Sequence, residues 1–413
     1  MPHAKCLIIT THYKPLVGGA QSVYDALANK VPARFCVLTA QRDYARGEDV
    51  DGYRAFDEAA GYKIFRIPRM RPDLLGDSPG AIVRLASHVK ARRIRQEVLR
   101  SALDAVRETE ANIICIGALD ALGGLVPELK EKTDARVVVY THGEEISQTA
   151  YSPKAEKARG QALQAADAVI AVSSFTTQLI AEKYGVPPAR IKCLGNGVDV
   201  ERFRDRPSEN VRVPLGLTAG PLVLAVGRLV ERKGFDRLLE AWPKVLASVP
   251  QAQLAIVGKG PLENSLKEAA EADEMGGSVH MLGHVTDGVL PSLYASADLF
   301  TMPNRTMPDG DTEGFGLVFL EAAAAGTPSV GGRAGGAVDA IIDGETGLLV
   351  NGDDPNAIAF ALTELLTDEV RRLQLGDAAR QHAMTQGWQD KAAELLAYFD
   401  SLLVKGRDGD ASG

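Results

Sequence analysis

A chain of 413 residues is too long for one ordinary hydrophobic core, so we expect two or three domains. Its 45% hydrophobic and 24% charged residues are typical of globular proteins, and its formal net charge of −8 argues against nucleic acid as a general partner. No stretch approaches the roughly 18 uninterrupted apolar residues of a transmembrane helix, and the first residues lack a secretion signal. We therefore expect a cytoplasmic protein.

The cysteines support that expectation. The chain has four of them, at positions 6, 36, 115 and 193, and they are scattered singly. No pair has the spacing of metal ligands or of a redox motif, so free thiols in a reducing compartment are predicted.

Strand-like and helix-like runs alternate along the chain, which is typical of parallel α/β sheets. The predicted strands are 5–11, 34–39, 63–67, 112–116, 136–140, 168–172 and 190–194, and then 222–227, 253–257, 278–282, 299–303 and 329–331. The polar residues 204–220 between the two series are predicted to form a linker. We predict two Rossmann-like, doubly wound domains, 1–204 and 205–387, with an amphipathic helix and tail at 388–413.

The most informative stretch is 311–321, which holds Glu313 in a Gly-rich loop and Glu321 in an apolar run. The apolar pattern predicts a buried helix that begins near Phe315 and ends at Gly326-Thr327-Pro328. Its free N–H donors, which attract anions, would be those of Gly314, Phe315, Gly316 and Leu317. A nucleotide sugar, with hydroxyls at one end and phosphates in the middle, suits this arrangement. Alternatively, Glu313 only complements the helix dipole and Glu321 is a solvated helical residue.

Glycine-containing turns follow the first predicted strand of each half. Gly18-Gly19 could bring backbone close to phosphate, although a simple turn is the alternative. The full Gly-x-Gly-x-x-Gly fingerprint is absent, which disfavours a dehydrogenase. In the second half, Gly227, Arg228 and Lys233 match a diphosphate-binding turn, with a solvated basic turn as the alternative.

Polar residues elsewhere are weaker candidates. His142 follows a predicted strand and either points into a cleft or caps structure. The acidic pairs Asp309/Asp311 and Asp353/Asp354 resemble metal signatures but are interpreted as loop residues. No metal is expected, because Arg228 and Lys233 can balance the leaving phosphates.

Residues 63–100 form a basic segment with ten Lys and Arg and three acidic residues, a net charge of +7. Its predicted helix has an apolar stripe, which favours either contact with an anionic membrane or packing on the sheet with the cations solvated. The two interpretations are compatible. The candidate lipid or acceptor contacts are Arg84, Lys90, Arg92, Arg93 and Arg95.

Taken together, these motifs resemble the retaining glycosyltransferases of the two-Rossmann (GT-B) type, in family 4. The resemblance covers nearly the whole chain and is strongest over 226–350. The motifs that carry it are Gly227-Arg228, Lys233-Gly234, Val257-Gly258-Lys259-Gly260-Pro261, the Glu313 and Glu321 pair and Gly335-Gly336. Within the family, Met302-Pro303-Asn304-Arg305 and the long loop before Glu313 are similar to GDP-mannose-dependent phosphatidylinositol mannosyltransferases.

The resemblance implies a role for each matching position. Arg228 and Lys233 would hold the donor diphosphate, Glu313 the sugar hydroxyls and Glu321 the ribose, with His142 over the donor sugar. Asp287 matches a position that contacts guanine in some mannosyltransferases. Facing the diphosphate and sugar would be Gly19 and the amides of Phe315, Gly316 and Leu317. The C-terminal helix would cross back onto the first domain, and the insertion at 42–60 lies where acceptor-recognition loops vary.

The implied activity is metal-independent transfer of a hexose, mannose favoured, from a nucleotide sugar to a lipid or glycan hydroxyl with an α linkage. This would serve cell-envelope or polysaccharide assembly, with possible association to the inner face of the membrane. A UDP-glucose-type transferase acting on a small molecule or a polyprenyl-linked glycan remains an alternative. So does a non-catalytic protein that binds sugar nucleotides. Phosphorylases are disfavoured because no pyridoxal-binding lysine context is present.

Overall fold

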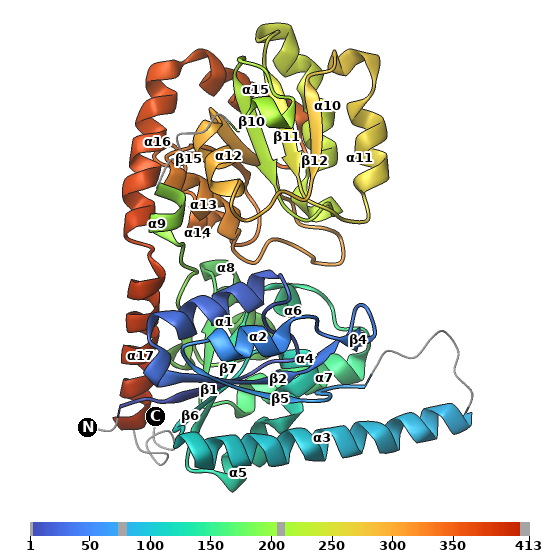
Figure 1. The fold of residues 1–413 in the computed structure, drawn as a ribbon, viewed down its shortest axis with the longest axis vertical. Coiled ribbons are helices and arrows are strands. Elements are labelled where there is room, and N and C mark those ends of the chain that lie inside the picture. Colours follow the sequence, from blue (N-terminus) through green and yellow to red (C-terminus); the bar gives the residue numbers. More distant parts are fainter. Residues whose placement is uncertain (1–2, 73–80, 205–210, 405–413) are drawn as a thin grey trace. The chain divides into compact units, whose positions relative to one another are not determined.

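The computed structural model describes residues 3–72, 81–204 and 211–404, without the side chains of 81–86 and 88. The chain forms two compact units (Figure 1). Unit 1 comprises Met1–Ala171, Thr177–Leu194 and Trp388–Gly413, and unit 2 comprises Val172–Thr176 and Gly195–Gly387. Each unit contains one parallel sheet with helices on its faces, so the predicted α/β fold of two doubly wound domains is confirmed.

Unit 1 is built on a seven-stranded sheet of order β5-β2-β1-β6-β7-β8-β9. Its strands are β1 (Cys6–Ile9), β2 (Phe35–Ala40), β5 (Lys63–Ile67), β6 (Ile113–Ile116), β7 (Arg136–Thr141), β8 (Ala168–Ala171) and β9 (Ile191–Cys193). All of its strand pairs are parallel. The connections reverse at β1, which pairs with β2 on one side and β6 on the other. Ligands of open α/β sheets bind at such a switch point, beyond the carboxyl ends of the strands.

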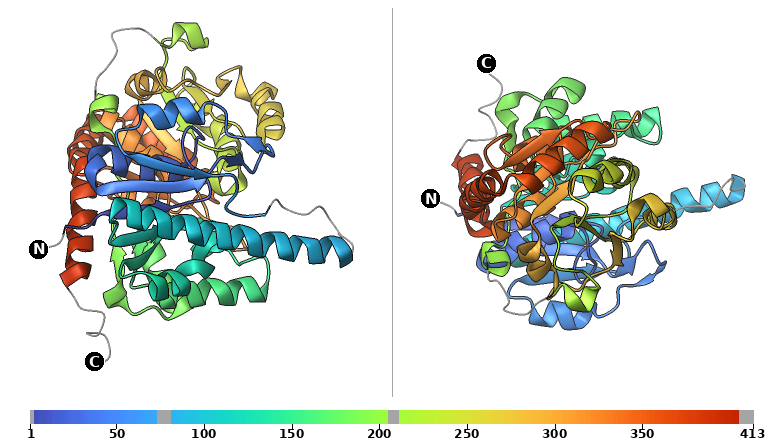
Figure 2. Two further views of the ribbon diagram at one scale, coloured as in Figure 1. Left: turned by 60° about the horizontal axis from the view of Figure 1, so that its bottom comes forward. Right: turned by 90° about the horizontal axis from the view of Figure 1, so that it is seen from above.

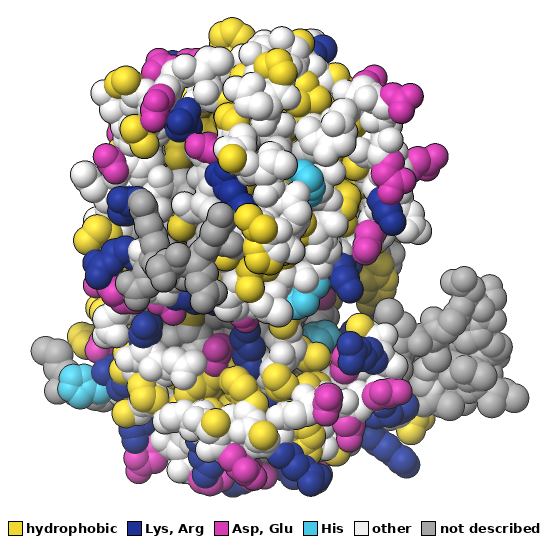
Figure 3. Space-filling view, turned by 45° about the horizontal axis from the view of Figure 1, so that its top comes forward, with side chains coloured by type: hydrophobic (Ala, Val, Ile, Leu, Met, Phe, Trp, Pro, Cys, Tyr) yellow, Lys and Arg dark blue, Asp and Glu magenta, His cyan; other side chains and the backbone are white. Residues whose placement is uncertain are grey.

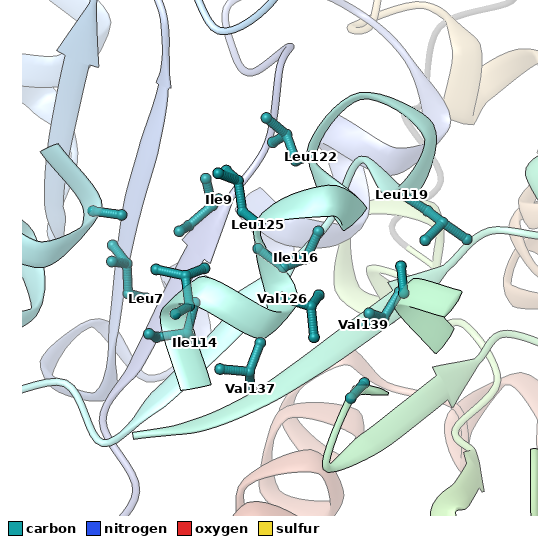
Figure 4. Close-up of a cluster of buried hydrophobic side chains, with 14 of the residues drawn as sticks. Leu7, Ile9, Ile114, Ile116, Leu119, Leu122, Leu125, Val126, Val137 and Val139 are labelled. Carbon is teal, nitrogen blue, oxygen red and sulfur yellow. The ribbon is translucent and has the colours of Figure 1, made fainter. Parts of the chain in front are cut away.

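The core of unit 1 follows from the alternation of side chains along these strands. Every second residue of β1, β6 and β7 points to the same face and packs against the segment that contains α4 (Leu119–Leu122) and α5 (Val126–Lys132) (Figure 4). The side chains of this cluster include Leu7, Ile9, Ile114, Ile116, Val137 and Val139 from the strands and Leu119, Leu122, Leu125 and Val126 from the covering segment. Burial of each such side chain contributes about 1.5–3 kcal/mol to folding, which stabilises these short strands.

The helices of unit 1 have the following bounds. They are α1 (Gly19–Lys30), α2 (Tyr53–Ala59), α3 (Ala81–Thr109), α4 (Leu119–Leu122), α5 (Val126–Lys132), α6 (Glu144–Ser147), α7 (Pro153–Ala165), α8 (Ser174–Tyr184, in unit 1 from Thr177 on) and α17 (Trp388–Val404). The last of these packs beside α1 (Figure 1). It buries Trp388, Ala392, Leu395, Leu396 and Phe399, a helical spacing that explains its amphipathic sequence. The predicted return of the C-terminal helix to the first domain is therefore confirmed.

Unit 2 holds a six-stranded parallel sheet of order β12-β11-β10-β13-β14-β15. Its strands are β10 (Leu222–Val226), β11 (Gln253–Val257), β12 (Val279–Gly283), β13 (Leu299–Met302), β14 (Ser329–Gly332) and β15 (Gly347–Val350). Its helices are α9 (Val200–Arg204), α10 (Phe235–Ser248), α11 (Glu263–Ala270), α12 (Leu290–Ser296), α13 (Leu317–Ala325), α14 (Ala337–Ala340), α15 (Pro355–Thr367) and α16 (Glu369–Met384). The switch point lies at β10, between β11 and β13.

Three details differ from the prediction. The boundary between the units falls after Leu194 rather than Arg204, because α9 packs on α12 and α13 of unit 2. Strand β15 was not predicted. The insertion after β2 is ordered as the hairpin of β3 (Arg42–Asp43) and β4 (Glu48–Asp49) followed by α2.

The basic segment forms α3, whose N-terminal part extends away from the rest of unit 1 in each ribbon view (Figures 1 and 2). Its C-terminal part packs on the sheet through Ile94, Val98, Ala102 and Ala105. The predicted apolar stripe therefore faces inward over this part. On the face drawn in Figure 3, acidic and basic side chains are interspersed with apolar ones. Among the helices of the described chain, none combines the length and apolarity that crossing a bilayer requires.

Candidate active site

The loop before α13 is shaped by a glycine. Gly316 has φ +88°, a left-handed conformation that other residues rarely adopt, and α13 begins at the next residue, Leu317. The predicted start near Phe315 was wrong for this reason. Phe315 is instead a buried residue of the loop. The first helical amides thus belong to Leu317 and the residues after it.

Glu313 is held by two cations from the segment after β10. Lys233 Nζ lies 2.5 Å and Arg232 Nη1 lies 2.9 Å from the same carboxylate oxygen. Burial raises the pKa of Glu313, but the two cations outweigh it, so the pKa is lowered and the side chain is a carboxylate. Arg232 Nε also lies 3.1 Å from Asp311. The structure therefore joins Lys233 and Glu313, and it adds Arg232, which the sequence analysis did not single out.

Backbone packing fixes the position of the Glu313 loop. The amide of Gly336 donates to the carbonyl of Glu313 at 2.8 Å. A Cβ on Gly335 would lie 2.2 Å from the same oxygen, and one on Gly336 would lie 2.0 Å from the carbonyl oxygen of Gly314. Only glycine fits at these positions, which gives a physical reason for the Gly335-Gly336 motif.

The turn after β10 presents its two predicted basic residues differently. Lys233 is buried, whereas Arg228 is exposed and makes no ion pair among those of the described residues. Gly227 is held by a 3.0 Å hydrogen bond from its amide to the carbonyl of Val257. Arg228 is thus free to contact a ligand, while Lys233 must exchange its partner to do so.

Glu321 lies in α13 and has a neutral hydrogen-bond donor rather than a cation. The hydroxyl of Tyr294 donates to Glu321 Oε2 at 2.9 Å. Burial raises the pKa of Glu321, so its environment is the opposite of that of Glu313. The two carboxylates of the 311–321 stretch are therefore placed for different tasks, ion pairing for Glu313 and neutral hydrogen bonding for Glu321.

Asp287 lies on the loop between β12 and α12. Its side chain is 88% exposed. Arg202 Nη2 donates to its backbone carbonyl at 3.0 Å and lies 3.7 Å from its carboxylate. The structure thus places Asp287 in unit 2 with the other candidate nucleotide contacts, and it identifies Arg202 as a partner that the sequence analysis missed.

In unit 1, the candidates gather beyond the carboxyl ends of β1 and β7. Gly19 is the first residue of α1, and the position of a Cβ on it has no heavy atom within 4 Å. Gly18 is the N-cap, with an extended backbone that any residue can adopt. His142 follows β7, stacks on Tyr140 and meets the edge of Tyr24.

The hydrogen bonds of His142 indicate which of its ring nitrogens carries the proton. Its Nε2 lies 2.6 Å from the hydroxyl oxygen of Tyr24, and that hydroxyl also lies 3.0 Å from the carbonyl of Gly117. The carbonyl only accepts, so the single phenol proton goes to Gly117 and Nε2 of His142 donates to the phenol oxygen. Burial lowers the pKa of His142 to about 4, so the imidazole is neutral and its Nδ1 keeps a lone pair.

Glu145 supports the same loop. Its Oε1 accepts from the amide of His142 at 2.7 Å. Burial raises the pKa of Glu145 to about 7, although backbone hydrogen bonds oppose that rise. A carboxyl group that titrates near neutrality therefore lies under the His142 turn.

The acidic pairs that resemble metal signatures have structural contacts. Asp309 accepts from the amide of Asp311, and Asp354 caps α15 by accepting from Asn356. Asp353 lies 3.4 Å from Arg305. Within the described part of the chain, no three His, Cys, Asp or Glu side chains gather in a way that could hold a metal ion.

Of the predicted basic contacts on α3, Arg92 and Arg93 are exposed, as is Lys90. Arg95 instead donates to the carbonyl of Gly124 at 2.7 Å and forms an ion pair with Glu128, so it ties α3 to α5. The side chain of Arg84 lies outside the described residues.

Comparison with known proteins agrees with this geometry. Residues 17–202 match the model of glycosyltransferase family 4, and residues 208–382 match that of the group 1 glycosyl transferases. The GDP-mannose-dependent α-(1-6)-phosphatidylinositol monomannoside mannosyltransferase of Mycobacterium tuberculosis is 33% identical over 400 residues, 96% of this chain and 98% of that protein. The chain belongs to glycosyltransferase family 4. The predicted family and enzyme class are therefore confirmed.

Two further relatives extend the comparison. The corresponding enzyme of Corynebacterium glutamicum, which acts on the monoacylated acceptor, is 31% identical over 404 residues, 96% of this chain and 98% of that protein. The crystal structure of Anabaena HepE with UDP and glucose aligns with a TM-score of 0.75 at 21% identity, covering 97% of this chain and 100% of that one. The latter similarity supports the GT-B fold alone.

Proposed function

We propose that this glycosyltransferase moves mannose from GDP-mannose to a hydroxyl of a phosphoinositide-type glycolipid, with retention of the α configuration. The observation that carries the proposal is the largely buried cluster of Lys233, Arg232 and Glu313, whose two cations follow β10 in the same segment as exposed Arg228. The cations are complementary to a diphosphate, and the carboxylate of Glu313 is complementary to the hydroxyls of a sugar. The near full-length similarity to GDP-mannose-dependent enzymes supports the choice of donor.

The cluster suits an exchange of partners when the donor binds. Without donor, the Lys233 ammonium is neutralised by Glu313 at 2.5 Å. A diphosphate is a stronger partner for Lys233 and Arg228, and its arrival frees oxygens of Glu313 to accept from the sugar hydroxyls. Arg232 remains beside Glu313 and Asp311 and keeps the carboxylate in place.

The reaction then depends on stabilising the leaving group. The bond between the anomeric carbon and the β-phosphate oxygen breaks, and the negative charge that develops on GDP is stabilised by Lys233 and Arg228. The acceptor oxygen attacks the same face of the sugar, and its proton passes to a phosphate oxygen of the departing GDP. Because two cations serve the diphosphate, we propose that no metal ion is needed.

The exposed cations of α3 support a proposal about the acceptor surface. Lys90, Arg92 and Arg93 lie close together in the sequence of α3 and are exposed, as is Val89, which is 48% exposed. The N-terminal part of the same helix extends from unit 1 (Figure 2). Cations near an anionic bilayer contribute about 1 kcal/mol each. We propose that this segment rests on anionic lipid and brings the enzyme to a membrane acceptor.

A transfer assay tests the donor and the acceptor. The purified chain is incubated with GDP-mannose or UDP-glucose and phosphatidylinositol monomannoside, with and without EDTA, and the products are resolved by mass spectrometry. We expect a mannosylated product from GDP-mannose alone, unchanged by EDTA. Glu313→Gln should lower kcat/KM by about 10²-fold or more. The matched control is Glu268→Gln, an exposed glutamate of the same unit, which should transfer like wild type.

The alternatives give different results in this assay. Transfer from UDP-glucose alone would replace the donor assignment. Binding of GDP without transfer to any lipid or glycan acceptor would favour the non-catalytic interpretation. Loss of activity in EDTA that Mg²⁺ restores would contradict metal independence.

Sedimentation with liposomes tests the lipid contact. At low salt, Arg92→Gln/Arg93→Gln should bind phosphatidylserine-containing liposomes roughly tenfold more weakly than wild type. Lys154→Gln/Lys157→Gln removes the same charge from exposed positions on α7 and should bind like wild type. Equal weakening by both pairs would indicate a general charge effect and would contradict a role for α3.

A further inference from the structure

Helix α9 supports the side of unit 2 that carries the nucleotide-binding candidates. It spans Val200–Arg204 and packs on α12 and α13. Arg202 and Phe203 are adjacent residues of this helix, and each supports a different candidate nucleotide-binding residue.

Arg202 holds the exposed Asp287 loop. Its Nη2 donates to the carbonyl of Asp287 at 3.0 Å and lies 3.7 Å from the carboxylate of the same residue. The guanidinium carbon also lies 5.0 Å from the centre of the Phe203 ring. The loop itself turns through the amides of Val289 and Leu290, which both donate to the carbonyl of Thr286. Asp287 is thus fixed through its backbone while its side chain stays 88% exposed.

Phe203 supports the second candidate. Its ring packs edge to face with Tyr294 at 5.6 Å, and the Tyr294 hydroxyl donates to Glu321 at 2.9 Å. The positive charge of Arg202 also acts on Glu321, where it lowers the pKa and so opposes the rise that burial causes. One short helix therefore positions both carboxylates that are candidates for the two ends of a nucleoside.

A fixed, exposed carboxylate selects among bases by the donors that it can accept. The Watson–Crick edge of guanine presents two adjacent N–H donors, which match two carboxylate oxygens. Uracil presents one N–H donor between two carbonyls, whose oxygens would face the carboxylate unfavourably. Discrimination of this kind requires the carboxylate to be held in place, because a mobile side chain can turn away from the mismatched base.

We propose that Arg202 is the positioning residue that makes unit 2 selective for a guanine over a uracil nucleotide, by holding the backbone carbonyl of Asp287 and pairing with its carboxylate. The inference rests on the proposed function, since it concerns the base of the same donor. Arg202 touches Asp287 and not the reacting atoms, so it acts through that residue. The contact is 39% exposed on the arginine side and adds little to stability, so its removal should leave the fold intact.

The test is calorimetric titration of GDP and UDP into the full chain carrying Arg202→Gln, with the melting temperature measured alongside. We expect the Kd for GDP to rise about tenfold and that for UDP to change less than threefold. Arg202→Lys retains one donor for the carbonyl, so the ratio of the two Kd values should lie between those of wild type and Arg202→Gln. The control is Arg204→Gln in the same helix, where Arg204 pairs only with Glu201 among the described residues at 3.2 Å, and both Kd values should stay within twofold of wild type.

Asp287→Asn completes the design. Combined with Arg202→Gln it should lower the GDP preference no further than Asp287→Asn alone, because Arg202 acts through Asp287. Equal changes in the two Kd values for Arg202→Gln would mean a merely structural role and would overturn the inference. If wild type transfers mannose from GDP-mannose but the Arg202 variants keep its GDP-to-UDP ratio, this inference fails and the proposed function stands. If wild type binds neither nucleotide, the proposed function fails first.

Discussion

Lys233 and Glu313 form a buried ion pair, with Nζ 2.5 Å from Oε2, between the segment after β10 and the loop before α13. Eighty residues separate the two, and the pair joins two loops that extend from neighbouring strands of one sheet. Since Arg232 contacts the same oxygen, the carboxylate is shared by two cations. This arrangement has consequences for stability as well as for ligand binding.

Replacement of Lys233 by Met should separate the two roles. Glu313 keeps Arg232, so the loss of stability should be about 1–3 kcal/mol rather than that of an isolated buried charge. The folded pKa of Glu313 lies below its unfolded value, so its contribution is present above the unfolded pKa and is lost as pH falls through the folded one. The unfolding free energy of Lys233→Met should therefore depend less on pH between pH 3 and 7 than that of wild type. Urea unfolding over this pH range measures the difference.

The double change Lys233→Met/Glu313→Gln supplies the control. It removes both charges of the pair, so it should be less destabilised than the sum of the single variants. Strict additivity would mean that the two side chains do not interact in solution. The two variants that lack Lys233 should lose diphosphate binding, because Lys233 is proposed to contact that group, whereas Glu313→Gln keeps Lys233 and should retain it.

Glu145→Gln should change the free energy of unfolding by an amount that depends on pH. The pKa of Glu145 is about 7 in the folded chain against 4.5 when unperturbed, so the native state holds the proton more tightly than the unfolded one. The stability that this provides is fully present at low pH and is lost as pH rises through 7. Gln keeps the acceptor for the His142 amide without a charge. We expect it to exceed wild type by roughly 1–3 kcal/mol at pH 8 and to match it near pH 4.

Chemical unfolding at a series of pH values checks this expectation. The exposed Glu131→Gln should follow the wild-type curve at every pH. A stabilisation by Glu145→Gln that is the same at pH 4 and pH 8 would show that charge is not its cause.

The sequence predicted the positions of the two candidate carboxylates in the chain better than their contacts. Glycines around Glu313 and the apolar run through Glu321 identified both carboxylates, because helix starts and buried helices leave periodic patterns. Arg232 was not predicted as a partner of Glu313 because three cations follow β10. Which of them reach Glu313 depends on the 3-10 turn at Glu231–Lys233. That turn has no distinctive pattern in the sequence.

The aromatic partners of the site residues were missed for a related reason. Tyr24 and Tyr294 lie among apolar residues of α1 and α12, so in the sequence they are indistinguishable from core residues. Their hydroxyls meet His142 and Glu321 across 118 and 27 positions of the chain. Strand order and helix position, which decide such contacts, follow from packing of the whole unit rather than from local spacing.

Tyr24→Phe should impair transfer without weakening nucleotide binding. The change leaves the Nε2 donor of buried His142 and the carbonyl of Gly117 without the hydroxyl that they share, at a cost of about 1–3 kcal/mol. His142 can then turn or change tautomer, so kcat should fall while the Kd for GDP, whose base we propose is bound by unit 2, stays constant. Steady-state kinetics and calorimetry measure the two quantities separately.

Tyr62→Phe is the matched control for this change. Its hydroxyl donates to Asp25 at 2.6 Å in the same unit and has no contact with His142. We expect a comparable loss of stability with kcat unchanged. A fall in kcat of equal size in both variants would attribute the effect of Tyr24 to general destabilisation.

Gly258→Ala should disturb the diphosphate turn from a distance. Gly258 follows β11 with φ +144°, and a Cβ there would lie 1.8 Å from the carbonyl oxygen of Gly227. The clash is with backbone, so the turn that leads to Arg228 and Lys233 must shift. Gly276→Ala is the control, because it shares a positive φ, +54°, but has open space around the added Cβ.

Backbone strain alone should cost about 1–2 kcal/mol in Gly276→Ala and leave the affinity for GDP unchanged. Gly258→Ala combines the clash with backbone strain at φ +144°, which lies outside the left-handed well that Gly276 occupies, so we expect it to be roughly 2–4 kcal/mol less stable than the control and to bind GDP at least about tenfold more weakly. Urea unfolding and calorimetry of the two variants make the comparison. Equal stability and affinity in both would mean that the contact between the β10 and β11 turns does not restrain the diphosphate site.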